Sequence, residues 1–118
     1  MILVTGGRAS GKREYVMSLG YSETDMADAV IDARPVIFNV QDMAMRDPEG
    51  SAALLERLCE KEVVITCEVG SGVIPLERRE RDGREAAGRL AVRLAQRADR
   101  VVRMVSGIPT VIKENNGR

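Results

Sequence analysis

The fold is decided by the segment "MILVTGGRASGKREYV", residues 1–16. Its apolar beginning predicts a short buried strand over residues 1–5. A helical pattern follows from Lys12 to Leu19, and Gly20 is expected to end that helix. The loop between them reads G-x-x-x-x-G-K-R, which has the glycine and lysine spacing of a phosphate-binding loop. The segment therefore predicts an α/β domain that begins with a strand, a phosphate loop and a helix.

In a phosphate-binding loop the glycines let backbone amides point at phosphate oxygens, and the helix N-terminus adds partial positive charge. The lysine contacts the outer phosphates, so we assign Lys12 a catalytic role, the stabilisation of charge on the transferred group. The residues expected to bind the nucleotide are Gly6, Gly7, Arg8, Ala9, Ser10, Gly11, Lys12 and Arg13. The alternative is a glycine-rich turn with a solvated lysine.

Arg13 departs from the usual motif, because a Ser or Thr at this position normally coordinates magnesium. A guanidinium cannot bind a cation, and it keeps its own charge. Arg13 therefore either contacts phosphate directly or turns outward on the helix, while Ser10 can offer a hydroxyl near the phosphates. Asn39 and Asp42 follow the second predicted strand, but neither is an acidic residue within it. Mg²⁺ is expected as a cofactor together with the nucleotide, and its ligands stay unknown.

The rest of the chain alternates apolar runs with helical patterns and polar loops. Strands are predicted over residues 35–40, 62–69, 100–105 and 110–113, helices over residues 51–61 and 76–98, and a loop over residues 41–50. Ser22 and Asp25 form a capping pair for a short helical turn. The alternation implies right-handed crossovers between parallel strands. We predict a single three-layer α/β domain of the P-loop NTPase-like class over residues 1–118, with a mostly parallel sheet.

Composition excludes several classes of function. Acidic and basic side chains balance to a formal net charge of zero over 118 residues, so no excess of positive charge favours nucleic acid. The apolar runs are too short for a signal-peptide core or a membrane span, and we expect a cytoplasmic protein. With two cysteines and no histidine, the sequence has no zinc-binding pattern.

Glu68 lies near the end of the predicted strand over residues 62–69 and precedes Gly70 and Gly72. Ligands bind at the carboxyl ends of parallel strands, and the glycines allow a tight loop close to a ligand. A carboxylate at this place can orient magnesium or accept a hydroxyl proton. We therefore name Glu68 as a second catalytic candidate, against the alternative of a surface glutamate before a glycine turn.

Two stretches carry a resemblance to a known family: "MILVTGGRASGKR" and "CEVGSGVIPLERRERDGREAAGRLAVRLAQRADRVVRMVSGIPTVIK". They resemble the bifunctional adenosylcobinamide kinase and adenosylcobinamide-phosphate guanylyltransferase family of cobalamin biosynthesis. The family's pattern P-x-x-R-x-x-R-x-x-R-x-x-x-G-R is matched by Pro75, Arg78, Arg81, Arg84, Gly88 and Arg89. The resemblance covers the N-terminal loop and most of the C-terminal half of the chain.

The resemblance implies an enzyme that uses ATP or GTP to phosphorylate the aminopropanol hydroxyl of adenosylcobinamide, a corrinoid, and then transfers GMP onto that phosphate. The family carries out the second reaction through a guanylylated histidine. This sequence contains no histidine and has Ala91 where the family has an asparagine. The resemblance therefore implies the kinase reaction rather than the transferase reaction. It also implies a homo-oligomer whose loops, with those of a neighbouring subunit, bind the corrinoid.

The arginines of the predicted helix over residues 76–98 allow two interpretations. Arg78, Arg81 and Arg84 lie nearest the glycine loop and are candidates for bidentate contacts with a triphosphate or a phosphorylated product. Arginines and acidic residues also alternate at i,i+3 and i,i+4 spacing, which is typical of a solvated helix surface. Two alternatives to the kinase stay open: a catalytically inactive nucleotide-binding or regulatory subunit of the same family, and an unrelated small-molecule kinase on the same fold.

Overall fold

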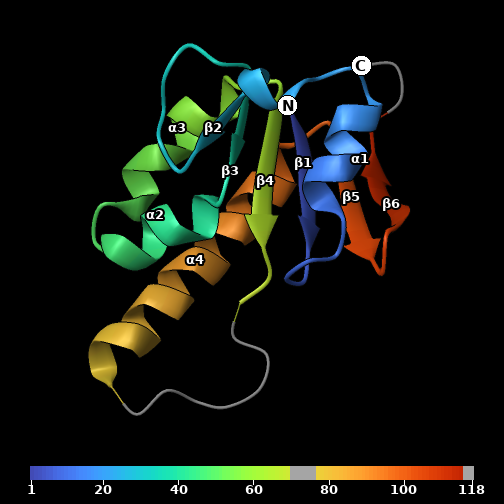
Figure 1. Cartoon of the computed structure of the whole chain (residues 1–118). Coiled ribbons are helices and arrows are strands. Elements are labelled where there is room, and N and C mark those ends of the chain that lie inside the picture. The colour runs from blue at the N-terminus through green and yellow to red at the C-terminus, as the bar shows by residue number, and fades with distance from the viewer. Residues whose placement is uncertain (70–76, 116–118) are drawn as a thin grey trace.

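The computed structural model describes residues 1–69 and 77–115 (Figure 1). The strands are β1 (Ile2–Gly6), β2 (Met26–Asp28), β3 (Val36–Phe38), β4 (Val63–Cys67), β5 (Arg100–Val105) and β6 (Ile108–Glu114). The α-helices are α1 (Lys12–Ser18), α2 (Val40–Arg46), α3 (Leu54–Cys59) and α4 (Arg78–Arg97), with 3₁₀ turns over Glu23–Asp25 and Ser51–Ala53. The strand, loop and helix predicted at the N-terminus are present.

β1 is an inner strand of one sheet, whose strand order is β2-β3-β4-β1-β5-β6. It pairs in parallel with β4 on one side and with β5 on the other. The β2–β3 and β3–β4 pairs are also parallel, and β5–β6 is antiparallel. The prediction of a mostly parallel sheet is therefore confirmed. Because β1, β3 and β4 run in the same direction, the residues that follow them meet at one edge of the sheet.

Helices cover both faces of the sheet, which produces three layers (Figure 1). Adjacent residues of β1 illustrate this, because successive strand residues point to opposite faces. Leu3 packs in one core with Leu58 of α3 and Leu90 of α4, whereas Val4 packs in a second core with Val16 of α1. Each of these side chains is at most 3 % exposed, and burying one contributes about 1.5–3 kcal/mol. The predicted three-layer α/β class is confirmed.

The prediction of a strand over residues 35–40 and a loop over residues 41–50 is wrong in part. β3 ends before Asn39, and α2 begins at Val40. Asn39 makes the change of direction with φ 58° and ψ 36°, a left-handed conformation that asparagine tolerates better than most residues. Val40 and Ala44 are then one helical turn apart and buried in the core. Their spacing is helical in the sequence, but the polar residues between them suggested a loop.

β2 is a strand that the sequence pattern does not indicate. The predicted capping pair before it is confirmed, because the backbone N–H of Ser22 donates to Asp25 Oδ2 at 2.8 Å. The chain then enters β2 at Met26, which is paired with Val36 of β3. Since β2 has only three residues, it has no periodicity of its own, and its strand partner determines its conformation.

The last strand is longer than the predicted residues 110–113 and forms a hairpin with β5. Ser106 and Gly107 connect the two strands with φ 50° and φ 79°. Positive φ at both connecting residues is the type I′ turn, whose twist suits a hairpin. From β6, Lys113 Nζ donates to two carbonyl oxygens in the last turn of α4, at 2.9 Å each. This contact ties the hairpin to the helix layer.

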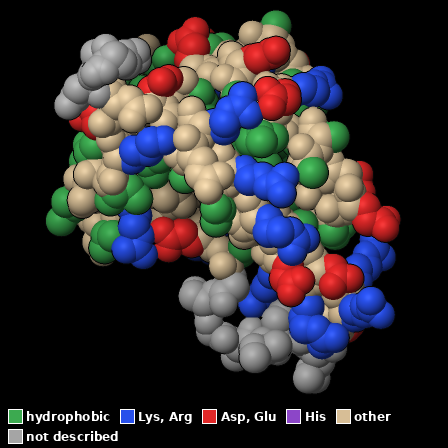
Figure 2. All heavy atoms as spheres, turned by 180° about the vertical axis from the view of Figure 1, so that it is seen from behind, with side chains coloured by type: hydrophobic (Ala, Val, Ile, Leu, Met, Phe, Trp, Pro, Cys, Tyr) green, Lys and Arg blue, Asp and Glu red, His purple; other side chains and the backbone are tan. Residues whose placement is uncertain are grey.

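The exposed side of α4 carries many of the basic side chains. Figure 2 views the molecule from behind and shows basic side chains, all arginines, along this helix, with acidic side chains between them. Arg89 and Glu85 form one i,i+4 pair, at 3.8 Å. Among the described helices, none is both long enough and apolar enough to cross a membrane.

Candidate functional site

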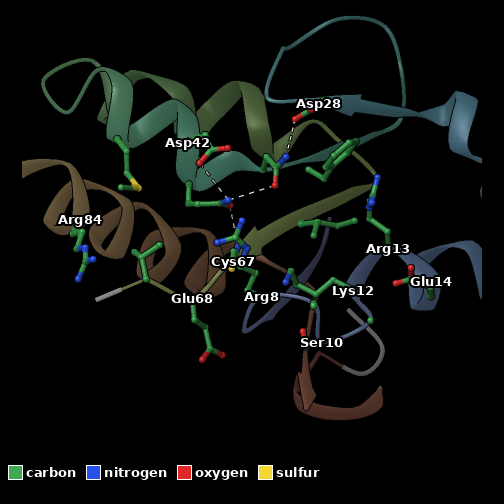
Figure 3. Close-up of a pocket in the computed structure, with 18 residues that line it drawn as sticks. Arg8, Ser10, Lys12, Arg13, Glu14, Asp28, Asp42, Cys67, Glu68 and Arg84 are labelled. Atoms are coloured by element: carbon green, nitrogen blue, oxygen red, sulfur yellow. Dashed lines mark hydrogen bonds between the residues drawn. The ribbon is translucent and has the colours of Figure 1, made fainter. Parts of the chain in front are cut away.

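A cleft lies at the carboxyl edge of the sheet, where β1, β3 and β4 end (Figure 3). Its volume is about 910 Å³, which falls in the range of ligand pockets. One side is the loop wall, which we define as residues 8–13. The other side is the polar wall, which we define as Asp28, Asn39, Gln41 and Asp42. Figure 3 shows Arg8, Ser10 and Lys12 on one side of the cleft and Asp28 and Asp42 on the other.

The turn that leads from β1 into the loop wall requires glycine at Gly6. Gly6 has φ 156°, and a Cβ on it would lie 2.6 Å from Met104 O and 2.7 Å from Ser10 Oγ. The β5–β6 turn braces the same loop, because the N–H of Gly107 donates to Ser10 O at 2.9 Å. The hairpin from the C-terminal half therefore supports the conformation of the N-terminal loop.

The Ser10 hydroxyl lies buried within the loop wall. Ser10 is 8 % exposed, and within the described chain no group hydrogen-bonds to its Oγ. Buried polar side chains in native proteins nearly always have a partner, and an exception needs an explanation. Ser10 lines the cleft, but its Oγ lies against Gly6, 2.7 Å from the place of an added Cβ, so the hydroxyl is not presented at the cleft surface.

Lys12 lies at the first position of α1 and lines the cleft. Its Nζ donates to the carbonyl oxygen of Gly7 at 2.5 Å, so the ammonium group is folded back over the loop. Among the residues predicted to bind the nucleotide, Arg8 to Arg13 line the cleft. Gly6 and Gly7 instead shape the turn and hold the lysine. The predicted loop residues are thus brought together as one surface.

Arg13 lies toward the end of β3. Its guanidinium carbon is 4.9 Å from the centre of the Phe38 ring, which is within the range of a cation–π contact. Both residues line the cleft. The sequence left open whether Arg13 contacts phosphate or turns outward. No local signal indicated the pairing with Phe38, because Arg13 lies in α1 and Phe38 at the end of β3.

Glu68 follows β4, and its backbone N–H donates to Gly6 O at 2.8 Å, next to the phosphate loop. Its carboxylate accepts two hydrogen bonds from Arg103 of β5, from Nε at 2.8 Å and from Nη2 at 3.1 Å. These hydrogen bonds are the main reason that the pKa of Glu68 is lowered, and the charges of Arg103 and Lys12 lower it further. Glu68 is therefore ionised and oriented. Sequence reasoning missed Arg103, although an arginine inside an apolar strand was a usable signal.

The polar wall is built from three separate segments. Asn39 Nδ2 donates to Asp28 Oδ1 at 2.8 Å, which joins the ends of β3 and β2. Gln41 is buried, and its Oε1 accepts the backbone N–H of Cys67 at 2.9 Å, which joins α2 to the end of β4. Asn39 and Asp42 were considered from the sequence, whereas Asp28 and Gln41 were missed. Nothing in the local pattern around Asp28 indicated a strand end.

The three candidate arginines of α4 occupy different surroundings. Arg84 lines the cleft, and its side chain is 30 % exposed, with Glu80 at 3.9 Å. Arg78 is 86 % exposed and lies 3.9 Å from Asp82. Arg81 is exposed and is not part of the lining formed by the described residues. Pro75, Gly70 and Gly72 fall outside the described residues.

The cleft lacks one group with which ordinary phosphate loops hold magnesium, because the position that usually provides a hydroxyl is Arg13. Within residues 1–69 and 77–115, no cluster of three or more His, Cys, Asp or Glu side chains could hold a metal ion. Glu68, which follows β4 beside β1, lines the cleft but is paired with Arg103. The expected Mg²⁺ therefore has no assigned ligands in the cleft.

Comparison with known proteins gives two matches. The family model described as cobinamide kinase / cobinamide phosphate guanyltransferase matches residues 39–112. The bifunctional adenosylcobalamin biosynthesis protein CobU of Salmonella typhimurium (strain LT2) is 46 % identical over 61 residues, which are 52 % of this chain and 34 % of the relative. The aligned segment thus spans about a third of the relative. The family match begins after the phosphate loop, so the interpretation of the loop rests on its motif and its geometry.

Proposed function

The chain belongs to the cobinamide kinase / cobinamide phosphate guanyltransferase family, and from this premise we propose that it binds ATP or GTP in the cleft and phosphorylates a corrinoid. The acceptor would be the aminopropanol hydroxyl of adenosylcobinamide. The observation that carries the proposal is the loop wall, where Ser10, Gly11 and Lys12 line one cavity. This cavity lies where parallel α/β sheets bind ligands.

In this proposal Lys12 leaves the Gly7 carbonyl and contacts the outer phosphates of the nucleotide. The acceptor hydroxyl oxygen forms the new bond to the terminal phosphorus, the bond to the bridging oxygen breaks, and the nucleoside diphosphate leaves. Positioning and charge stabilisation provide most of the catalysis in such transfers. Lys12 stabilises charge on the transferred group, and Arg84 adds a second positive charge from α4.

Glu68 orients the acceptor hydroxyl in this proposal and does not act as the general base that removes its proton. Its lowered pKa, caused chiefly by the hydrogen bonds from Arg103, makes it a weak base at neutral pH. A fixed carboxylate oxygen still accepts a hydrogen bond from a hydroxyl and directs the oxygen lone pair at phosphorus. The proton released on transfer passes to solvent.

The proposal covers the kinase reaction alone. In the family that this sequence resembles, GMP transfer passes through a histidine, and this chain contains none. The corrinoid would bind over loops near the cleft, together with a neighbouring subunit of a cytoplasmic homo-oligomer. These features of substrate and assembly belong to the proposal as well.

The test is incubation of the purified protein with cobinamide and ATP or GTP, with and without Mg²⁺, followed by mass spectrometry of the corrinoid. We expect a phosphate adduct and no GMP adduct. Lys12→Ala should reduce turnover by at least about a hundredfold, because it removes the charge on the transferred group. Arg57→Ala, at an exposed position of α3, is the matched control and should keep full activity. Undiminished phosphorylation by Lys12→Ala would refute the proposal.

A second candidate is a nucleotide-binding subunit of the same family without chemistry. The observation that favours it is Arg13, which replaces the hydroxyl that ordinary phosphate loops use for the metal. For this candidate, calorimetry should detect nucleotide binding, and no phosphorylated corrinoid should form with either ATP or GTP. A phosphorylated corrinoid would exclude it.

A further inference from the structure

Ordinary phosphate loops hold magnesium with two protein groups: the hydroxyl that follows the loop lysine and an acidic residue on a neighbouring strand. The first of these groups differs in this cleft, because Arg13 follows Lys12. The acidic residue is Glu68, which directly follows β4, the strand paired with β1. Its carboxylate already accepts two hydrogen bonds from Arg103. The loop therefore offers no hydroxyl oxygen to magnesium, and the acid at the strand end is engaged in an ion pair.

The other carboxylates that line the cleft are Glu14, Asp28 and Asp42. Asp28 accepts a hydrogen bond from Asn39, and among the described residues no three acidic side chains form a cluster that could hold a metal ion. A magnesium ion in this cleft would therefore depend on single carboxylates, water and the phosphates for its ligands.

Arg13 brings a fixed positive charge to the same place. Its guanidinium lies 4.9 Å from the ring centre of Phe38, the residue that precedes Asn39, so it reaches from the loop toward the end of β3. Stacking on a ring leaves the edge of the planar guanidinium free to donate hydrogen bonds, and that edge matches the geometry of phosphate oxygens. Arg13 and Phe38 both line the cleft, so the guanidinium edge is placed where a bound phosphate would lie.

We propose that Arg13 supplies the positive charge that a divalent cation supplies in ordinary phosphate loops, so that this cleft binds a nucleoside triphosphate without Mg²⁺. The inference rests on the proposed nucleotide binding. It adds that the positive charge beside the phosphates comes from Arg13 and not from a bound Mg²⁺. The cavity is lined by four basic residues, Arg8, Lys12, Arg13 and Arg84, and by four acidic ones, Glu14, Asp28, Asp42 and Glu68. The loop wall carries three of the basic residues, and a metal-free triphosphate presents more negative charge to that wall than its magnesium complex does. Phe38 acts as a positioning residue, because its ring holds the guanidinium in place.

The test is isothermal titration calorimetry of the full chain with ATP and with GTP, at constant ionic strength, in excess EDTA and in excess MgCl₂. We expect the wild-type Kd in EDTA to be at most about twofold weaker than in MgCl₂. Arg13→Ser removes the charge and restores a hydroxyl. It should weaken binding in EDTA by at least about tenfold, since a hydrogen bond to a charged group is lost, and added Mg²⁺ should recover part of that loss.

Two further variants separate charge from fold. Phe38→Leu keeps Arg13 but removes its ring, and should weaken binding in EDTA without introducing a dependence on Mg²⁺. Arg57→Ser makes the same change of residue on the exposed surface of α3 and should change neither Kd. Circular dichroism of each variant shows whether the fold is retained.

The outcomes distinguish this inference from the proposed function. Wild-type binding that weakens by tenfold or more in EDTA would overturn the inference and leave nucleotide binding intact. Equal Kd values for Arg13→Ser in the two solutions, with wild-type affinity, would also overturn it. No detectable binding of either nucleotide in either solution would overturn both the inference and the proposed function. The wild-type comparison alone decides the matter if Arg13→Ser does not fold.

Discussion

The two walls of the cleft are built in different ways. The loop wall is one continuous segment, residues 8–13, placed between β1 and α1. The polar wall joins the end of β2, the end of β3 and α2 through side-chain hydrogen bonds. One wall presents Arg8, Lys12 and Arg13, and the other presents Asp28 and Asp42 (Figure 3).

The two walls differ in which contacts form them. The loop wall depends on residues close in sequence, and the polar wall depends on contacts between segments far apart in the chain. Local spacing was enough to indicate the loop wall, because its backbone depends on glycines close in sequence. The polar wall depends on the pairing of β2 with β3 and on the bond between Gln41 and Cys67. Changes in the loop wall should therefore act through backbone strain and charge, and changes in the polar wall through lost contacts between segments.

Breaking the turn that leads from β1 into the loop wall should have the largest effect on stability. Gly6→Ala places a Cβ 2.6 Å from Met104 O at a φ of 156°, so it should lower the free energy of unfolding by about 3 kcal/mol and weaken nucleotide binding. Urea denaturation measures the first effect, and calorimetry with ATP the second. Gly88→Ala is the matched control, since nothing lies within 4 Å of its added Cβ. It should be neutral or stabilise α4 by up to about 1 kcal/mol.

Breaking the polar wall should have a smaller effect. Gln41→Met keeps the volume of the side chain but leaves the Cys67 N–H without its acceptor. The free energy of unfolding should fall by about 1–3 kcal/mol, the cost of an unsatisfied buried donor. Gln96→Met, at an exposed position of α4, should change it by less than about 0.5 kcal/mol. Equal effects of the two substitutions in urea denaturation would show that the contact between α2 and β4 does not hold this wall.

Substitution of two arginines of α4 tests where the nucleotide site ends. Arg84 lines the cavity, whereas Arg78 is 86 % exposed. Arg84→Ala should weaken nucleotide binding by about tenfold, because a charged donor is lost, and Arg78→Ala should change the Kd by less than about twofold. Calorimetry with ATP measures both. A larger loss of affinity in Arg78→Ala than in Arg84→Ala would show that the nucleotide binds outside the described cleft.

The smallest effect concerns the ion pair between Glu68 and Arg103. Arg103→Met removes the hydrogen bonds that are the main cause of the lowered pKa of Glu68, so the pKa should rise toward the ordinary value of about 4.3. Because the folded-state pKa is lowered, the pair stabilises the fold above the unfolded-state pKa and loses this contribution as pH falls through the folded-state pKa. NMR titration of the Glu68 side-chain carbon measures the shift. An unchanged pKa in Arg103→Met would show that the pair is not formed in solution.

The structure differs from the sequence-based prediction where tertiary contacts decide a local conformation. Residues 40–46 were predicted mainly as a loop because polar residues interrupt the apolar spacing, yet burial of Val40 and Ala44 makes them a helix. β2 was missed because a strand of three residues carries no periodicity. Arg103 was missed as a partner of Glu68 because it lies on β5 whereas Glu68 follows β4, and only the strand order brings them together.

By itself the sequence determined the strand, glycine loop and helix at the N-terminus, the mostly parallel α/β class, and the resemblance to a family of corrinoid kinases. These depend on spacing and periodicity over short distances, which a sequence shows directly. Only the tertiary structure decided that Arg13 lies on Phe38, that Arg103 holds Glu68, and that Arg84 rather than Arg78 lines the cleft. Those contacts join segments far apart in the chain, and their geometry follows from how the strands are ordered and how the helices pack on them.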